Sequence, residues 1–239
     1  MLTPFEQQLS NLGLDIVHAF PLDGISIDSP HFEPLSRRFE GARTGLLIGN
    51  TRALWPCFLG WLAEHPDWRS TTDPLDDYAQ DVITRAASEH LRDARLFWTH
   101  ELDDYRVPVQ SLCHQSGLAH LSRGRFNVHP EYGPWFGMRA LVVLPDDLGI
   151  PLSPPINPSS PAVEDRVAAH FEVLRARASA GLSSTHIRTS WEDWLGLRDL
   201  YDVGRAYRYT DPQIRYHYTK DKSVLVDALA HRASAPTGR

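Results

Sequence analysis

The chain has 239 residues, of which 42% are hydrophobic and 23% are charged, as in a globular protein with a buried core. Its formal charge is −6 at pH 7, whereas a general nucleic-acid binder would carry an excess of basic residues. No stretch is long and apolar enough to span a membrane, and the N-terminus lacks the pattern of a secretory signal. We therefore expect a cytoplasmic protein that binds neither nucleic acid nor membranes.

The hydrophobic pattern predicts helices and strands in irregular alternation. Helix-capping signals occur at Thr3, at Asn50-Thr51, at Thr72-Asp73-Pro74 and at Ser190. Together with apolar periodicity and short apolar runs, they predict helices over residues 3–13, 52–64, 72–91, 110–121 and 162–178, strands over 14–20, 45–49, 95–99 and 137–145, irregular loops over 21–43 and 151–161, and a mostly helical C-terminal third. No internal repeat or long linker is present, so the fold class is α+β or α/β.

The segment from His129 to Arg139 carries most of the chemical information. Two prolines and two glycines shape a turn, which delivers Trp135, Phe136 and then Arg139 onto an apolar strand. Glycine lets a backbone approach a ligand closely, aromatic rings offer flat surfaces, and arginine can clamp an anion with two hydrogen bonds. The turn therefore suits a large planar ligand with an anionic partner. A packed aromatic turn with Arg139 in a structural salt bridge fits the same residues.

Four stretches together resemble one protein family. The turn His129-Pro130-Glu131-Tyr132-Gly133-Pro134-Trp135-Phe136, with Met138-Arg139 after it, resembles that of the cobalamin-processing protein family of methylmalonic aciduria and homocystinuria type C. Residues 45–62, Thr72-Asp73-Pro74-Leu75-Asp76, and Trp191-Glu192-Asp193-Trp194 with Arg198-Asp199 resemble its other segments in the same order. A similar turn occurs in epoxyqueuosine reductases. Those enzymes need cysteine-ligated clusters, which Cys57 and Cys113 cannot supply alone.

The resemblance implies a fold and a reaction. The fold is a single α+β domain over residues 1–232, with a mixed sheet flanked by helices as in flavin reductases and nitroreductases, and a frayed tail over 233–239. The protein would bind cobalamin with its benzimidazole base detached from cobalt. It would remove the upper ligand, either cyanide by reduction with reduced FMN or FAD, or an alkyl group by transfer to a thiol such as glutathione. A cobalamin-dependent methyltransferase or a flavin reductase would be its protein partner.

The resemblance also assigns site residues. Arg139 and Arg198 match arginines linked to glutathione binding, so both are predicted to be catalytic. The corrin site is predicted to comprise His114, Gly117, Asn127, His129, Gly133, Trp135, Phe136 and Met138. Asn127 stands where the animal protein has a cysteine. A further glutathione-binding arginine of the family has no counterpart near Val224, although Lys222 lies close to it.

Resident metals have little support in the sequence. The twelve histidines show no zinc-site spacing and no His-Glu-x-x-His. The base-off motif Asp-x-His-x-x-Gly is also absent, so we expect no protein histidine on cobalt. We predict no metal held by protein ligands, although a dispersed iron site of two histidines and a carboxylate stays open.

Two alternatives to a cobalamin-processing enzyme remain. One is a carrier that shields cobalamin without chemistry, and the other is a flavin- or iron-dependent oxidoreductase on the same fold that has lost the corrin. The C-terminal third also allows two interpretations. Its tyrosines and arginines would form either a lid with stacked guanidinium groups or a helical packing layer. These residues are Tyr201, Tyr207, Tyr209, Tyr216 and Tyr218 with Arg205, Arg208 and Arg215.

Overall fold

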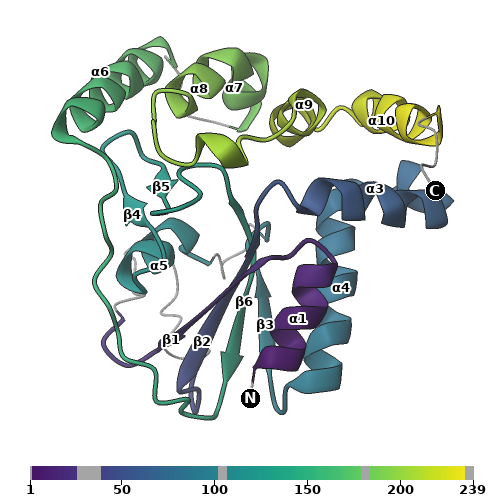
Figure 1. Cartoon of the computed structure of the whole chain (residues 1–239), viewed down its shortest axis with the longest axis vertical. Helices are drawn as coiled ribbons and strands as arrows, with labels where there is room; N and C mark the ends of the chain where they lie inside the picture. The colour runs from purple at the N-terminus through teal and green to yellow at the C-terminus, as the bar shows by residue number, and fades with distance from the viewer. Residues whose placement is uncertain (1, 26–38, 102–106, 179–183, 235–239) are drawn as a thin grey trace.

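A computed structural model describes residues 2–25, 39–101, 107–178 and 184–234 (Figure 1). Its α-helices are α1 (Thr3–Asn11), α3 (Leu54–Glu64), α4 (Pro74–His90), α5 (Val109–Gln115), α6 (Pro161–Arg177), α7 (Ser184–Thr189), α8 (Trp191–Arg198), α9 (Asp211–Thr219) and α10 (Lys222–Ser234). Its strands are β1 (Ile16–Pro21), β2 (Thr44–Asn50), β3 (Arg95–Trp98), β4 (His120–Leu121), β5 (Asn127–Val128) and β6 (Gly137–Leu144). Most of the loop expected over 21–43 lies outside the described residues.

The four long strands form one sheet in the order β1-β2-β6-β3, and β4 pairs with β5 separately. All described ladders are antiparallel, whereas we expected a mixed sheet. The reason is the position of β6. Strands β2 and β3 are joined through α3 and α4 and run in the same direction, but β6 inserts between them and runs against both. The α+β class is confirmed.

The sheet is covered on both faces (Figure 1). Helices α1 and α4 pack on one face, where Leu46 and Ile48 of β2 join the core. Helix α5 and the β4–β5 pair lie on the other face, which receives Leu47. This alternation follows from the two-residue period of a strand.

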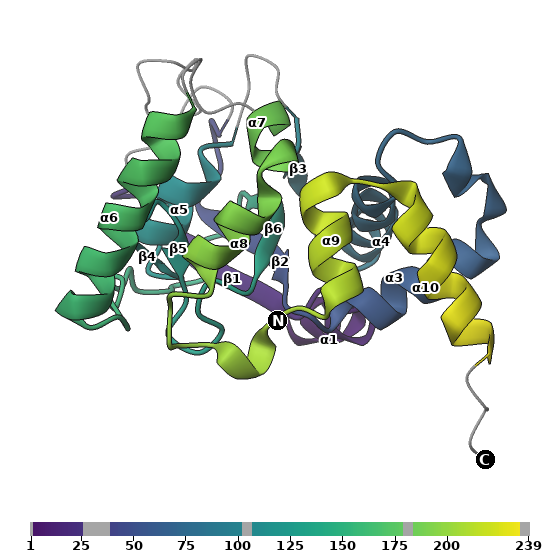
Figure 2. The same ribbon diagram turned by 90° about the horizontal axis from the view of Figure 1, so that it is seen from above.

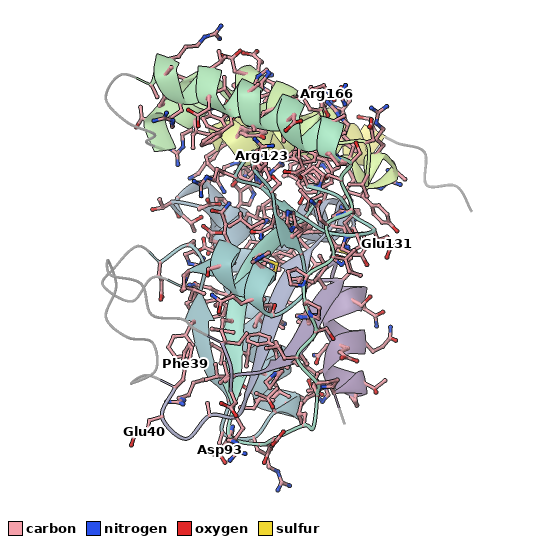
Figure 3. All side chains as sticks on the ribbon, turned by 90° about the vertical axis from the view of Figure 1, so that its left-hand side faces the viewer. Phe39, Glu40, Asp93, Arg123, Glu131 and Arg166 are labelled. Atoms are coloured by element: carbon pink, nitrogen blue, oxygen red, sulfur yellow. The ribbon has the colours of Figure 1, made fainter. Side chains whose placement is uncertain are left out.

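The C-terminal helices α6 to α10 form a third layer across one end of the sheet (Figures 1 and 2). Their core is rich in aromatic residues and includes Trp135 from the turn before β6. The β4–β5 pair is tied to α6, because the backbone N–H of Arg123 donates to Glu164 Oε2 over 2.9 Å and the Arg123 side chain pairs with Asp165. Figure 3 shows Arg123 against α6.

Two helix boundaries differ from the expectations. Helix α5 ends at Gln115 instead of continuing to residue 121. Gly117 has φ +83°, and an ideal Cβ at this position would lie 2.3 Å from the carbonyl oxygen of Ser153, so the chain must leave the helix there. Helix α3 starts at Leu54 without a side-chain cap, because its N-cap residue is Ala53, whose side chain has no hydrogen-bond acceptor.

Of the other predicted helix caps, the one at Asp73 is confirmed and the one at Ser190 is not. The hydroxyl of Ser190 donates to the carbonyl oxygen of His186 over 2.8 Å and does not cap α8. Asp73 caps α4 as predicted, accepting from the N–H of Leu75 over 3.2 Å. Helix α10 runs to Ser234, and residues 235–239 of the expected tail lie outside the described residues.

Candidate functional site

A β-bulge in β6 turns the side chain of Arg139 onto the α4 side of the sheet. Ile48 of β2 pairs with Ala140, but the next residue, Gly49, pairs with Met138, so Arg139 is the extra residue. Simple alternation from Leu141 would place Arg139 on the α5 face. The bulge reverses this, and Met138 packs on the α5 face instead.

The re-aimed guanidinium of Arg139 is buried and held by two neighbours. Its Nε donates to Asn50 Oδ1 over 2.8 Å, and its Nη1 lies 3.8 Å from Asp76 Oδ1 at the start of α4. Burial is the main cause of a raised pKa at Asp76, and the charge of Asp73 adds to it. Arg139 therefore has an ion partner, as the packed-turn interpretation requires. It also lines a small cavity together with Tyr209 and His217.

Arg198, the last residue of α8, is in an unusual environment. The residue is 7% exposed, and its Nε and Nη1 have no hydrogen-bond partner among the described residues. The guanidinium carbon lies 5.2 to 5.5 Å from the ring centres of Phe126, Trp135 and Tyr218. Cation–π contacts offset part of the cost of burying this charge. They leave free N–H donors, which an arginine uses to bind carboxylates and phosphates.

Trp135 contacts two arginines with different surroundings. Arg198 lies on its ring at 5.3 Å, and Arg208 lies at the same distance from the same ring. Arg208 is half-buried and paired with Asp199 and Asp211, so its charge is already satisfied. Trp135 itself is 1% exposed. In the described structure it supports the two guanidinium groups and is not an open wall for a planar ligand.

The structure adds two residues that the sequence did not indicate, His217 and Lys220. His217 on α9 lines the cavity of Arg139 and a second cavity of about 200 Å³, which Lys220 also lines. The Nζ of Lys220 lies 2.7 Å from Asp73 Oδ2. Lys222, which lies close to Val224 in the sequence, instead donates to the backbone carbonyls of Arg69 and Thr71. The lysine on the cavity wall is therefore Lys220.

A second group of predicted residues lies on the α5 side of the sheet. His129 stacks on Tyr132 with ring centres 4.3 Å apart, and the ring of Phe136 meets His129 edge-on at 6.1 Å. The Nδ1 of His129 accepts from the backbone N–H groups of Glu131 and Tyr132. Burial lowers the pKa of His129 to about 4, so the ring is neutral at pH 7. Glu131 lies at the edge of the molecule in Figure 3 and accepts from the hydroxyl of Tyr207.

His114 and Asn127 accompany this group beside α5. The Nδ1 of His114 accepts from the N–H of Leu121 over 3.1 Å, so the proton of a neutral ring resides on Nε2. Asn127 Nδ2 donates to the carbonyl oxygen of Gln110 over 3.0 Å. Both side chains hold the short β4–β5 pair against α5.

In the described structure, Gly117 and Gly133 let another segment of the chain pack closely against them. Gly133 has φ +57°, and an ideal Cβ there would lie 2.1 Å from the carbonyl oxygen of Val203. Both glycines permit a close approach of another part of the chain, where we expected approach of a ligand. The turn thus divides the predicted site, because Trp135 joins the C-terminal layer and Phe136 joins the α5 side.

The C-terminal tyrosines behave mainly as packing residues. Tyr201, Tyr209, Tyr216 and Tyr218 are buried. The interspersed Arg205 and Arg215 pair with surface aspartates. These contacts support the packing-layer interpretation over a lid. Within the described residues, no cluster of three His, Cys, Asp or Glu side chains could hold a metal ion, and no helix is long and apolar enough to cross a membrane.

Comparison with known proteins gives a structural match without a sequence match. No family model and no curated protein matches the chain. Among solved structures, the B12-trafficking protein CblC of C. elegans, a homologue of human MMACHC, is similar with a TM-score of 0.70 at 15% sequence identity. The similarity covers 99% of this chain and 97% of that one. The chain has the CblC fold. An epoxyqueuosine reductase bound to a tRNA stem loop is less similar, with a TM-score of 0.42 at 12% identity over 67% of this chain and 50% of that chain.

Proposed function

We propose that this protein binds cobalamin with its base detached and transfers the upper alkyl ligand to a thiol. The observation that carries the proposal is the CblC fold over 99% of the chain. Arg198 supports the thiol half of the proposal, because it is buried and its Nε and Nη1 have no hydrogen-bond partner in the part of the chain that the structure describes. A thiol with a carboxylate group, such as glutathione, would satisfy these donors.

The proposed reaction has a clear electronic logic. Cobalamin is the substrate, and loss of its lower nitrogen ligand changes the ligand field of cobalt and makes its reduction easier. Attack of a thiolate on the alkyl carbon then leaves two electrons on cobalt. Arg139 and Arg198 approach the same buried residues from β6 and α8, since both guanidinium charges act on His217 and Tyr209. Positive charge at this place favours a thiolate over a thiol.

We place the corrin on the α5 side, beside His129, Tyr132 and Phe136. His129 stacks on Tyr132 and meets the buried ring of Phe136 edge-on, so the three rings form one aromatic cluster next to α5. Nε2 of His114 would supply a hydrogen-bond donor for a corrin amide. Reductive removal of cyanide with reduced FMN or FAD is a second reaction of this site, and it rests on the sequence resemblance alone.

Methylcobalamin and glutathione test the proposal, with Arg208→Met as a matched control for Arg198→Met. The guanidinium carbons of both arginines lie 5.3 Å from the centre of the Trp135 ring, but Arg208 already has acidic partners. We expect the wild-type protein and Arg208→Met to form S-methylglutathione. Arg198→Met should bind methylcobalamin and need at least ten times more glutathione for the half-maximal rate.

The other functions correspond to other results of this experiment. Cobalamin binding without thioether formation, with or without reduced flavin, would identify a carrier. Absence of cobalamin binding would leave a flavin- or iron-dependent oxidoreductase on the CblC fold. Equal loss of binding and turnover in Arg198→Met, with the fold intact, would contradict a role for Arg198 toward the thiol.

A further inference from the structure

His217 occupies a position that the proposed reaction has not yet used. It lies on α9 in the walls of two cavities, one shared with Arg139 and Gln213 and one shared with Arg188 and Lys220. The first holds about 10 Å³, at most one water molecule, and the second holds about 200 Å³. The imidazole is thus reachable from a cavity although protein surrounds it.

Aromatic contacts fix the orientation of this imidazole. The ring of His217 meets Tyr209 edge-on at 6.0 Å and Tyr218 edge-on at 5.4 Å. Within residues 2–25, 39–101, 107–178 and 184–234, the hydroxyl of Tyr218 has no hydrogen-bond partner, and neither has Gln213 Oε1 on the wall of the smaller cavity. Buried polar atoms without partners are rare in native proteins and call for a specific explanation. A bound polar ligand would provide one.

The charges that face His217 come from several elements. Arg139 approaches from β6, Arg198 from α8, Arg188 from α7 and Lys220 from the residue after α9. Burial is the main cause that holds the pKa of His217 well below 6.5, and the charges of Arg198, Lys220 and Arg139 add to it. The ring is therefore neutral at pH 7 and has an acceptor nitrogen.

Two carboxylates neutralise part of this positive charge. Asp73 pairs with Lys220, and Asp76 lies beside Arg139. The donors of Arg198 stay unsatisfied. An incoming carboxylate would therefore settle on Arg198 and cancel part of the positive charge near His217. Because those charges lower the pKa of His217, such a ligand would raise the proton affinity of the imidazole as it binds.

We infer that His217 is the acceptor of the thiol proton during alkyl transfer, an inference that rests on the proposed function. The S–H proton moves to the free nitrogen of His217. The sulfur electron pair forms the new S–C bond to the alkyl carbon, and the Co–C bond breaks with both electrons staying on cobalt. Cobalt is thereby reduced from Co(III) to Co(I), and the products are a thioether and an imidazolium that later returns its proton to water.

The test is the pH profile of single-turnover demethylation of methylcobalamin by glutathione. If the protein supplies no proton acceptor, only glutathione that is already ionised to the thiolate reacts. At glutathione concentrations far below saturation, the pKa of the free thiol, about 8.5, governs this reaction, so the rate then rises about tenfold for each pH unit between 6.5 and 8. With His217 as the acceptor, the rate of the wild-type protein changes little over this range. At pH 7 we expect His217→Gln to be roughly 100-fold slower, the usual scale of general base catalysis.

Three variants make the result decisive. His217→Phe keeps a ring against Tyr209 and Tyr218, so it serves if His217→Gln does not fold, and it should show the same tenfold slope. His231→Gln on exposed α10 is the control and should keep the flat profile. Equal slopes of rate against pH in the wild-type protein and in both His217 variants, with cobalamin binding intact, would overturn the inference. Absence of turnover in wild-type protein as well would instead overturn the proposed function, and the role of His217 with it.

Discussion

At the scale of single residues, Arg198 connects stability with function. Burying a guanidinium group without an anion destabilises the folded state, and cation–π contacts with nearby aromatic rings offset only part of that destabilisation. Arg198 is therefore a charge that ligand binding would satisfy. Arg139 does not share this property, because Asn50 and Asp76 already contact it.

Replacing Arg198 with methionine should therefore not destabilise the protein. We expect its free energy of unfolding to stay the same or to rise by about 1 to 4 kcal/mol, as when an apolar side chain replaces a buried charge. Urea unfolding measures this, and Arg208→Met, which loses partly exposed ion pairs, should change by about 1 kcal/mol or less. A loss of about 3 kcal/mol or more in Arg198→Met would show that Arg198 has a structural partner.

Protonation of buried histidines sets the acid limit of stability. The pKa of His129 is about 4 in the folded protein and about 6.5 when unfolded, so the unfolded state binds the proton more tightly. The stability that the neutral His129 ring contributes to the free energy of unfolding is complete above pH 6.5 and is lost as the pH falls toward 4. The pKa values of His18, His120 and His217 are lowered too, mainly by burial, and act in the same direction.

Urea unfolding at pH 7.5 and pH 4.5 checks this. His129→Gln should reduce the pH-dependent loss by about 1 to 2 kcal/mol, a value that allows for partial exposure of the ring. Identical losses in the two proteins would mean that His129 is not buried in its neutral form.

Only some of the residues in the proposed site could be named from the sequence, for a physical reason. Arg139 and Arg198 lie in short segments that resemble family motifs, so both could be singled out as predictions. His217 and Lys220 carry no such pattern. Their place depends on how α9 packs against α7 and α8, which is a property of the tertiary structure.

At the scale of elements, the bulge in β6 decides which side of the sheet receives Arg139. Gly49 on the facing strand makes room for it. An ideal Cβ on Gly49 would lie 2.7 Å from the carbonyl oxygen of Gly137 and 2.8 Å from Met138 Sδ. Neither distance is compatible with normal packing, so the bulge and the glycine depend on each other.

Gly49→Ala should accordingly destabilise the protein by about 1 to 3 kcal/mol, the usual cost of overpacking. It should also raise the glutathione concentration needed for the half-maximal rate, because Arg139 shifts with the bulge. The control is Gly196→Ala at an exposed position of α8, where no described atom beyond the helix's own backbone and the neighbouring residues lies within 4 Å of the new methyl group. This change should stabilise the protein by about 0.5 to 1 kcal/mol through helix propensity. Equal effects of the two substitutions would contradict the assigned role of Gly49.

Element prediction worked where local signals are strong. The apolar runs of β2 and β6 and the capped start of α4 follow from the sequence, since burial and capping are encoded in adjacent residues. The early end of α5 does not, because it depends on the distant carbonyl of Ser153. The antiparallel sheet likewise depends on where the last strand inserts.

At the scale of the whole molecule, the C-terminal helices lie across one end of the sheet and α5 lies on one of its faces (Figure 1). Arg198 and His217 belong to the C-terminal helices, whereas Phe136 and Tyr132 pack beside α5. The turn from His129 to Arg139 passes between the two regions, so one short segment contacts both. This arrangement suits a reaction between two bound molecules. The corrin would lie on the rings, and the thiol would approach it from the cations.

Optical titration of the purified protein with cyanocobalamin and methylcobalamin tests this account most directly. We predict a saturable change to the base-off absorption spectrum with both compounds, unchanged in Arg198→Met because that residue serves the thiol. No spectral change at protein concentrations of tens of micromolar would contradict cobalamin binding and, with it, the proposed function.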